Sequence, residues 1–172
     1  MARIVAALVA LMALALPLPA SAAWGWTSWG MSAKDVINGS GGRVQIARAE
    51  EDQRVNDWWM LAAGPVTDDG FAFDGQFYFD KRGKQLHLVR LTLQKPDDCG
   101  RLTARLTELH GAPVDASAVV TVSGRSVKIT ALRWNDDGAG NFLALTSLPG
   151  VGQIMPLCFI RYRPVTEPDA AS

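Results

Sequence analysis

Cysteine and histidine are the residue types that most often carry chemistry, and each occurs only twice in this chain. Cys99 and Cys158 lie far apart in the sequence, so they do not form the closely spaced C-x-x-C pair of a redox motif. In an exported protein, an even pair of cysteines most simply forms a disulfide. We therefore predict a structural disulfide between Cys99 and Cys158, with two buried free thiols as the alternative.

The two histidines, His87 and His110, fit no catalytic or metal-binding pattern. His87 lies between leucines in a predicted strand, and His110 closes a predicted helix, where its side chain suits the helix dipole. The chain lacks the G-x-S-x-G motif of a nucleophilic serine, and no ligand spacing indicates zinc. We expect packing and helix-capping roles for the histidines, and we predict no catalytic residue, no metal site and no cofactor.

Acidic residues gather in two segments that invite a functional interpretation. Residues 135–141 look like a calcium loop, but Ala139 cannot ligate at its fifth position and Thr146 replaces the bidentate acid at its twelfth. Residues 50–52 are three adjacent acids, whereas glycoside hydrolysis needs two carboxylates that face each other across a cleft. We interpret the first segment as a hairpin turn and the second as a solvated surface.

Tryptophans supply the candidate binding surface of this chain. Trp24 and Trp26 are two residues apart, so their rings share one side of an extended segment. Tryptophan rings can stack on sugars or fill a pocket of a partner protein. The alternative is that these rings pack within their own domain. The candidate surface consists of Trp24, Trp26, Trp29, Trp58 and Trp59.

The first 22 residues have the composition of a cleavable secretory signal. A basic start precedes an apolar run at residues 4–16, and prolines and small residues follow. The run is well short of the roughly 20 residues of a membrane span. We predict a signal peptide at residues 1–22, a single domain at 23–163 and a disordered tail at 164–172. The protein would be exported, periplasmic or secreted, with no stable membrane span after signal cleavage.

The spacing of apolar residues predicts two helices and eight strands. Ser32 and Asp35 form a capping box at the start of a short helix that residues 39–42 end. Phenylalanines alternate with other residues over 71–79, which is the period of a strand, although Asp74 and Gly75 could form a turn that splits it. The predicted strands cover residues 43–49, 57–63, 71–79, 84–94, 118–123, 126–134, 141–148 and 155–163.

The second predicted helix, which Asp97 and Asp98 open, carries an apolar face. Cys99 lies on the same face as Leu102, Leu106 and Leu109, so it points toward the sheet, where Cys158 could meet it. Helices alternate along the chain with strands spaced for antiparallel hairpins. We therefore predict the α+β class: antiparallel β-meanders with two helices packed on one face. A tandem helix-plus-meander arrangement is one interpretation of this order.

Residues 29–32 (WGMS), followed by Val36, resemble the entry-helix signature, roughly G-M-[ST]-x-x-x-V, of small exported envelope domains. Residues 79–83 before a strand and residues 109–113 at the end of a helix agree with the same group. The group includes the BamE-like lipoproteins of outer-membrane assembly and folds related to β-lactamase-inhibitor protein. The resemblance implies a small α+β domain that binds proteins without catalysis. This chain lacks the lipidation cysteine and has more strands than one BamE-like unit, so no functional residue is transferred.

Charge and motifs together leave three functional hypotheses. The chain has 17 basic and 17 acidic side chains, which argues against nucleic acid or an anionic membrane as a main partner. The first hypothesis is a non-catalytic accessory, scaffold or inhibitor domain that binds another envelope protein. The second is a module that binds cell-wall glycan or peptidoglycan through surface tryptophans. The third is a hydrolase with an unrecognised site.

Overall fold

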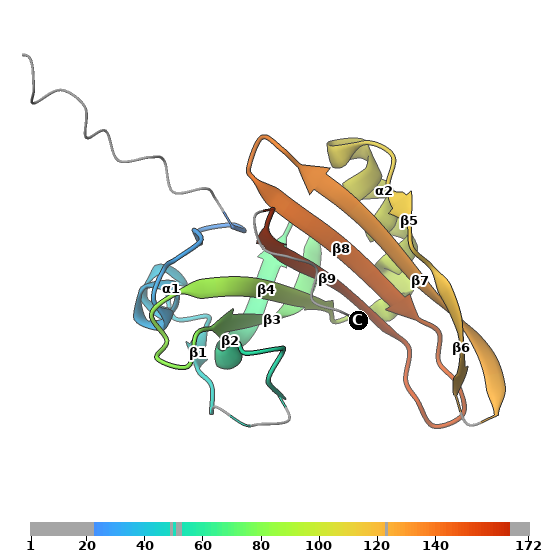
Figure 1. Cartoon of the computed structure of the whole chain (residues 1–172), viewed down its shortest axis with the longest axis horizontal. Coiled ribbons are helices and arrows are strands. Elements are labelled where there is room, and N and C mark those ends of the chain that lie inside the picture. The colour runs from blue at the N-terminus through green and yellow to red at the C-terminus, as the bar shows by residue number, and fades with distance from the viewer. Residues whose placement is uncertain (1–22, 49, 51–52, 123, 166–172) are drawn as a thin grey trace, which may run out of the picture.

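The structure, a computed structural model, describes residues 23–48, 50, 53–122 and 124–165. The predicted signal peptide and residues 166–172 of the predicted tail lie outside these described residues. One antiparallel sheet of nine strands organises the molecule (Figure 1), in the order β1-β2-β3-β4-β9-β8-β7-β5, and β6 also pairs with β7. The strands are β1 (Gln45–Ile46), β2 (Trp59–Asp68), β3 (Phe71–Phe79), β4 (Leu86–Leu93), β5 (Val114–Asp115), β6 (Ala118–Val122), β7 (Arg125–Asp136), β8 (Asn141–Leu148) and β9 (Leu157–Pro164).

Among the described residues, two short α-helices accompany the sheet, α1 (Ala33–Gly39) and α2 (Cys99–His110), and a 3-10 turn, η3 (Pro96–Asp98), leads into α2. The predicted cap of α1 is confirmed, because the Ser32 hydroxyl oxygen accepts a hydrogen bond from the Asp35 backbone N–H at 3.2 Å. Within the described ranges, no helix has the length and apolar character to cross a membrane.

The predicted α+β class is wrong. Strands account for 49% of the structure and helices for 17%, so the fold is mostly antiparallel β-sheet. β4 pairs with β9 from Val89 opposite Tyr162 to Thr92 opposite Phe159, and this pairing joins early and late strands into one sheet. Separate helix-plus-meander units are therefore replaced by a single continuous sheet. Local periodicity identifies individual elements, but it contains no information on a pairing between segments so far apart.

Several strands differ from their predicted limits. β3 runs unbroken through Asp74 and Gly75, which do not form a turn, and β9 extends to Pro164, which the sequence pattern assigns to the tail. The predicted strand at 43–49 is reduced to the two residues of β1. Its approach to the sheet requires Gly64 of β2, because a Cβ there would lie 2.2 Å from the Arg43 carbonyl oxygen.

The main core lies on one face of the sheet, which we call the core face. Alternate residues of the strands point to this face, and the helices add Val36, Leu102 and Leu106 to it. Leu109, predicted on the same side of α2, is 55% exposed near the end of the helix. The largest side chains buried almost completely on the core face include Phe73, Phe77, Phe79, Leu91, Leu143, Leu145 and Ile160.

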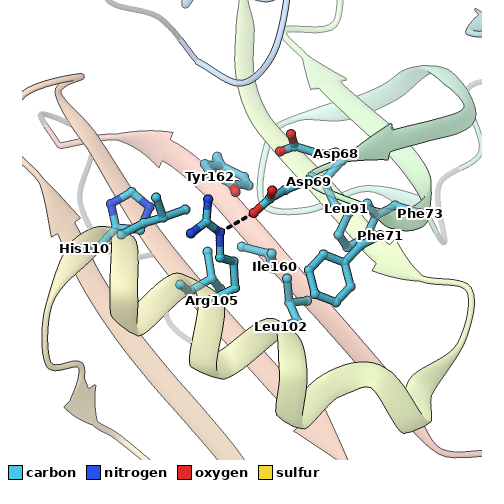
Figure 2. Close-up of a pocket in the computed structure, with 12 residues that line it drawn as sticks. Asp68, Asp69, Phe71, Phe73, Leu91, Leu102, Arg105, His110, Ile160 and Tyr162 are labelled. Atoms are coloured by element: carbon cyan, nitrogen blue, oxygen red, sulfur yellow. Dashed lines mark hydrogen bonds and ion pairs between the residues drawn. The ribbon is translucent and has the colours of Figure 1, made fainter.

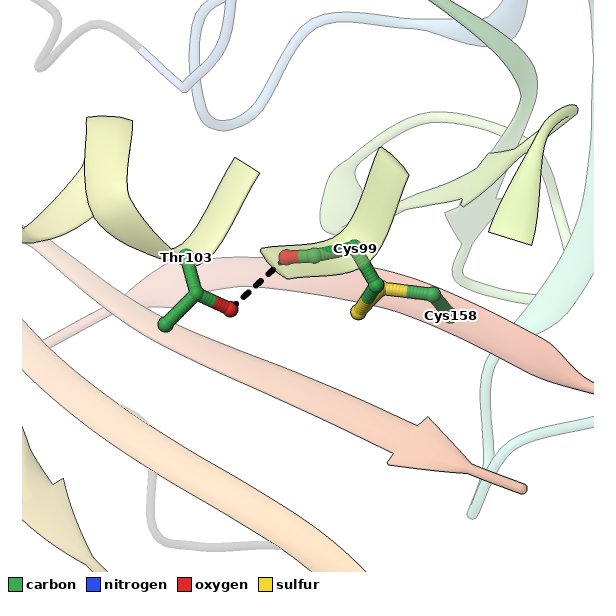
Figure 3. The surroundings of a disulfide bond; sticks show 3 residues. All are labelled: Cys99, Thr103 and Cys158. Carbon is green, nitrogen blue, oxygen red and sulfur yellow. Dashed lines mark hydrogen bonds between the residues drawn. A yellow bond between two sulfur atoms is a disulfide. The ribbon is translucent and has the colours of Figure 1, made fainter. Parts of the chain in front are cut away.

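The predicted disulfide between Cys99 and Cys158 is confirmed (Figure 3). The two Cα atoms lie 5.9 Å apart, although the cysteines are separated by 59 positions in the sequence. Cys99 begins α2, and Thr103 one turn later donates its hydroxyl hydrogen to the Cys99 carbonyl oxygen at 2.9 Å. Cys158 is fully buried in β9. The bond therefore attaches the first turn of α2 to a central strand of the sheet.

Candidate functional site

The three N-terminal tryptophans use their indole N–H groups within the chain. Trp24 is 6% exposed, and Trp26 and Trp29 are half-buried. The donor–acceptor pairs are Trp24 to the Asp68 carboxylate (2.9 Å), Trp26 to the Val36 carbonyl (3.1 Å) and Trp29 to the Asn141 side-chain oxygen (2.8 Å). This geometry agrees with the alternative that the rings pack within their own domain. That these rings form a binding surface stays a prediction.

Trp58 lies on the face of the sheet opposite the core face, and Trp59 lies near the edge of the sheet. Trp58 stacks on His87, with ring centroids 5.4 Å apart and planes within 2° of parallel. Trp59 is half-buried, and the cationic groups of Arg54 and Lys81 lie 5.9 Å and 5.8 Å from its ring centroid. Trp58 also packs against a small second core of Met60, Tyr78 and Leu88. His87 is thus engaged in ring stacking, and both tryptophans remain predicted binding residues.

Arginines form a row on the face of the sheet opposite the core face. We call this face, where it is formed by β4, β7, β8 and β9, the open face. Strand register places Arg90 opposite Arg161, Arg161 opposite Ala144, and Ala144 opposite Arg133. Arg163 lies on the same face, two residues further along β9. Among the described residues of these four strands, alternation places no acidic side chain on the open face. Positive charge is therefore concentrated there.

Two phenylalanine rings support these arginines. The Arg90 guanidinium carbon lies 4.1 Å from the centroid of the Phe159 ring, and that of Arg161 lies 5.8 Å from the same ring. The Arg163 guanidinium carbon lies 4.0 Å from the centroid of the Phe142 ring. A guanidinium stacked on an aromatic face can also make hydrogen bonds with its N–H edge, and Arg161 and Arg163 each have further interactions within the chain. The stacks thus hold the positive groups in fixed positions.

Arg90 combines one satisfied and one unsatisfied donor, since its guanidinium hydrogen-bonds the Tyr78 side chain. Its Nε atom is buried and has no hydrogen-bond acceptor within the described part of the chain. A buried polar donor without an acceptor costs free energy, and a bound ligand can remove that cost.

An apolar groove of about 420 Å³ adjoins the arginine row on the open face. Ala131 of β7 and Ala144 of β8 line it with small side chains, and the larger Ile129 and Phe159 contribute to the same lining. Arg161, a member of the row, also lines the groove. A ligand in the groove would therefore meet apolar surface and positive charge together.

The arginines of this face are not among the candidate residues that the sequence supplies. A signal is present, since Arg161 and Arg163 alternate with apolar residues in a predicted strand, and Arg90 and Arg133 also lie within strands. Only the register between strands brings them into one row. Within the part of the chain that the structure describes, no group of three His, Cys, Asp or Glu residues is arranged to hold a metal ion.

Comparisons with models of protein families, with curated proteins and with solved structures find no match to this chain. The resemblance of residues 29–32 and Val36 to BamE-like and inhibitor-type domains therefore stays a prediction.

Proposed function

We propose that this protein is a non-catalytic, exported binding domain whose open face holds an extended acidic segment of a partner protein. The observation that carries the proposal is the row of Arg90, Arg161 and Arg133 beside an apolar groove. Guanidinium groups bind carboxylates through paired, charge-assisted hydrogen bonds, and an apolar groove adds affinity by removing apolar surface from water.

The spacing of the face suggests the pattern of the bound segment. Phe159 lies two residues before Arg161 on β9, and Ala131 lies two residues before Arg133 on β7. Two residues of a strand span about 6.6–6.8 Å, so a peptide running along the strands would match the face with an acidic side chain two residues from an apolar one. A segment of the type acid-x-apolar is the expected occupant.

Export to an oxidising compartment is supported by two features. The Cys99–Cys158 disulfide is of the kind that persists in secreted and periplasmic proteins. The composition of residues 1–22 is that of a secretory signal. Both agree with a partner in the cell envelope or outside the cell.

The test is selection of random short peptides, displayed on phage, by the oxidised protein. We expect enrichment of acid-x-apolar sequences, which should bind less well as salt screens the charges. Arg161→Gln and Arg133→Gln should each reduce this binding, because each removes a guanidinium from the row. Arg82→Gln is the matched control, since Arg82 is exposed in the turn between β3 and β4, away from the open face.

Thermal unfolding of each variant would verify that it folds like the parent protein. The proposal is contradicted if the selected peptides lack acidic residues, or if the Arg161 and Arg133 variants bind them as well as the Arg82 variant does. Binding of uncharged cell-wall glycan by all variants alike would instead support the glycan-binding hypothesis.

A further inference from the structure

A second cavity lies between α2 and the sheet, on the side of the core face (Figure 2). Its volume is about 140 Å³. Apolar cavities of about 150 Å³ in other proteins accommodate benzene, so this one has room for a single six-membered ring or a branched alkyl group. Its apolar lining includes Phe71, Phe73, Leu91, Leu102 and Ile160.

Charged groups surround the entrance to this cavity. Arg105 on α2 pairs with two carboxylates, that of Asp69 in the turn before β3 and that of Glu108 at 2.8 Å, so its positive charge is compensated. Asp68, at the end of β2, also lines the cavity and accepts the indole hydrogen bond of Trp24. This arrangement leaves the entrance with an excess of negative charge.

The C-terminal end of α2 does not cancel the excess of negative charge at the entrance. His110 lines the cavity, and its Nδ1 atom lies 3.7 Å from an Asp136 carboxylate oxygen. A protonated His110 would therefore be balanced by Asp136, just as Arg105 is balanced by its partners. The field at the entrance attracts cations and repels anions.

Tyr162 of β9 provides a polar group inside the cavity. Its side chain is only 9% exposed, and it lines the cavity. Burial, together with the carboxylates of Asp68 and Asp136, raises the pKa of Tyr162 far above its usual value, so the hydroxyl stays neutral. The hydroxyl oxygen has lone pairs, so it can accept a hydrogen bond from a ligand in the cavity.

We propose that this cavity binds a small primary ammonium ion with an apolar body, an alkyl- or arylammonium. The apolar group fills the pocket between α2 and the sheet, and the ammonium group lies at the entrance, toward the Asp68 carboxylate and the Tyr162 hydroxyl. The site is independent of the proposed peptide-binding function, because it lies on the other side of the sheet from the arginine row.

Three probes of similar shape and different charge test this proposal: benzylammonium, benzyl alcohol and benzoate. Protein NMR spectra recorded during titration at neutral pH should show saturable shifts at residues around the cavity with benzylammonium. Benzyl alcohol should bind more weakly, and benzoate should not bind. Equal binding of benzoate, or shifts confined to other parts of the protein, would overturn the proposal.

Two conservative variants assign the contacts. Asp68→Asn removes the charge but keeps an oxygen that can accept the Trp24 hydrogen bond, and it should weaken benzylammonium binding about tenfold or more. Tyr162→Phe keeps the ring and removes the hydroxyl, and it should weaken binding by a smaller factor. Asp57→Asn is the control, because Asp57 is exposed and does not line the cavity.

Unchanged affinity in both the Asp68 and the Tyr162 variants would contradict the assignment. Arg161→Gln, which tests the open face, should leave benzylammonium binding intact. The two proposals can therefore fail separately.

Discussion

The core face of the sheet carries phenylalanines and leucines packed against two helices, whereas the open face carries arginines that lie on phenylalanine rings. Neighbouring residues of one strand belong to these different surroundings: Ile160 is almost fully buried in the core, and Arg161 next to it borders the groove. The chain is neutral as a whole, yet the open face collects positive charge. Net charge alone thus misses a positively charged face that the alternation of a sheet creates.

The two faces of the sheet should also differ in what their side chains contribute, stability on the core face and binding on the open face. A truncated side chain on the core face leaves a cavity that its rigid neighbours cannot fill. On the open face, truncation of a side chain removes one member of an arginine–phenylalanine stack that is already partly in contact with water. Substitutions on the core face should therefore lower stability, and substitutions on the open face should mainly change binding.

The largest expected difference between the faces concerns two phenylalanines. Phe77→Ala on the core face should lower the free energy of unfolding by about 3–5 kcal/mol, because Phe77 is fully buried. Phe159→Ala on the open face should cost about 1–2 kcal/mol, from partial burial and the loss of its arginine stacks. Chemical denaturation of both variants measures the two costs. Equal values would show that the open face is packed as tightly as the core.

The disulfide tests whether α2 depends on its covalent attachment to the core face. The double variant Cys99→Ala/Cys158→Ala should lose about 2–4 kcal/mol of unfolding free energy, because the unfolded chain is no longer constrained by a long loop. Denaturation of the parent protein with and without reductant should give a similar difference. Peptide binding at the open face should persist in the double variant at temperatures where it remains folded, and its loss would contradict the independence of the two faces.

The two tyrosines of the chain give the effect that is smallest at neutral pH, because it appears only in alkali. Burial raises the pKa of Tyr78 and of Tyr162; nearby Arg90 partly opposes this rise for Tyr78, while Asp68 and Asp136 reinforce it for Tyr162. Ultraviolet absorbance should therefore show that Tyr78, packed in the small second core, ionises before Tyr162. Tyr78→Phe and Tyr162→Phe variants assign the two steps, and the reverse order would contradict this account.

The same shifts set the direction of a stability change. A tyrosine whose pKa is raised by folding contributes stability that is fully present below about pH 10, the pKa of an unfolded tyrosine. Above that value the native state holds its proton more tightly than the unfolded state does. The free energy of unfolding should then fall by up to about 1.4 kcal/mol per pH unit for each tyrosine, and Tyr162→Phe should make this fall shallower.

Local patterns predict both helices, most of the strands and the disulfide, but not β5 or several strand limits. The face of α2 that Cys99 shares with Leu102 and Leu106 predicts both a helix and its contact with the sheet. The class was wrong because the balance of sheet and helix depends on strands that extend past their apolar segments, and on the β4–β9 pairing. β5, with two residues, is too short to produce a periodic pattern.

The candidate site was harder to predict than the fold. Tryptophans are conspicuous in the composition, but the indole groups of Trp24, Trp26 and Trp29 are engaged within the chain. The arginines at 90, 133 and 161 are conspicuous only once the register of four strands is known. When a site takes a single residue from each of several strands, those residues form no local motif in the sequence.

The last strand among the described residues, β9, lies in the middle of the sheet between β4 and β8. A polypeptide that is still being synthesised, or that ends before Leu157, has β4 and β8 but lacks the strand that joins them. Each would then present a row of unpaired backbone N–H and C=O groups, which is a template for pairing with other chains. Completion of the sheet must therefore wait for the C-terminal residues, and loss of those residues would expose the chain to aggregation.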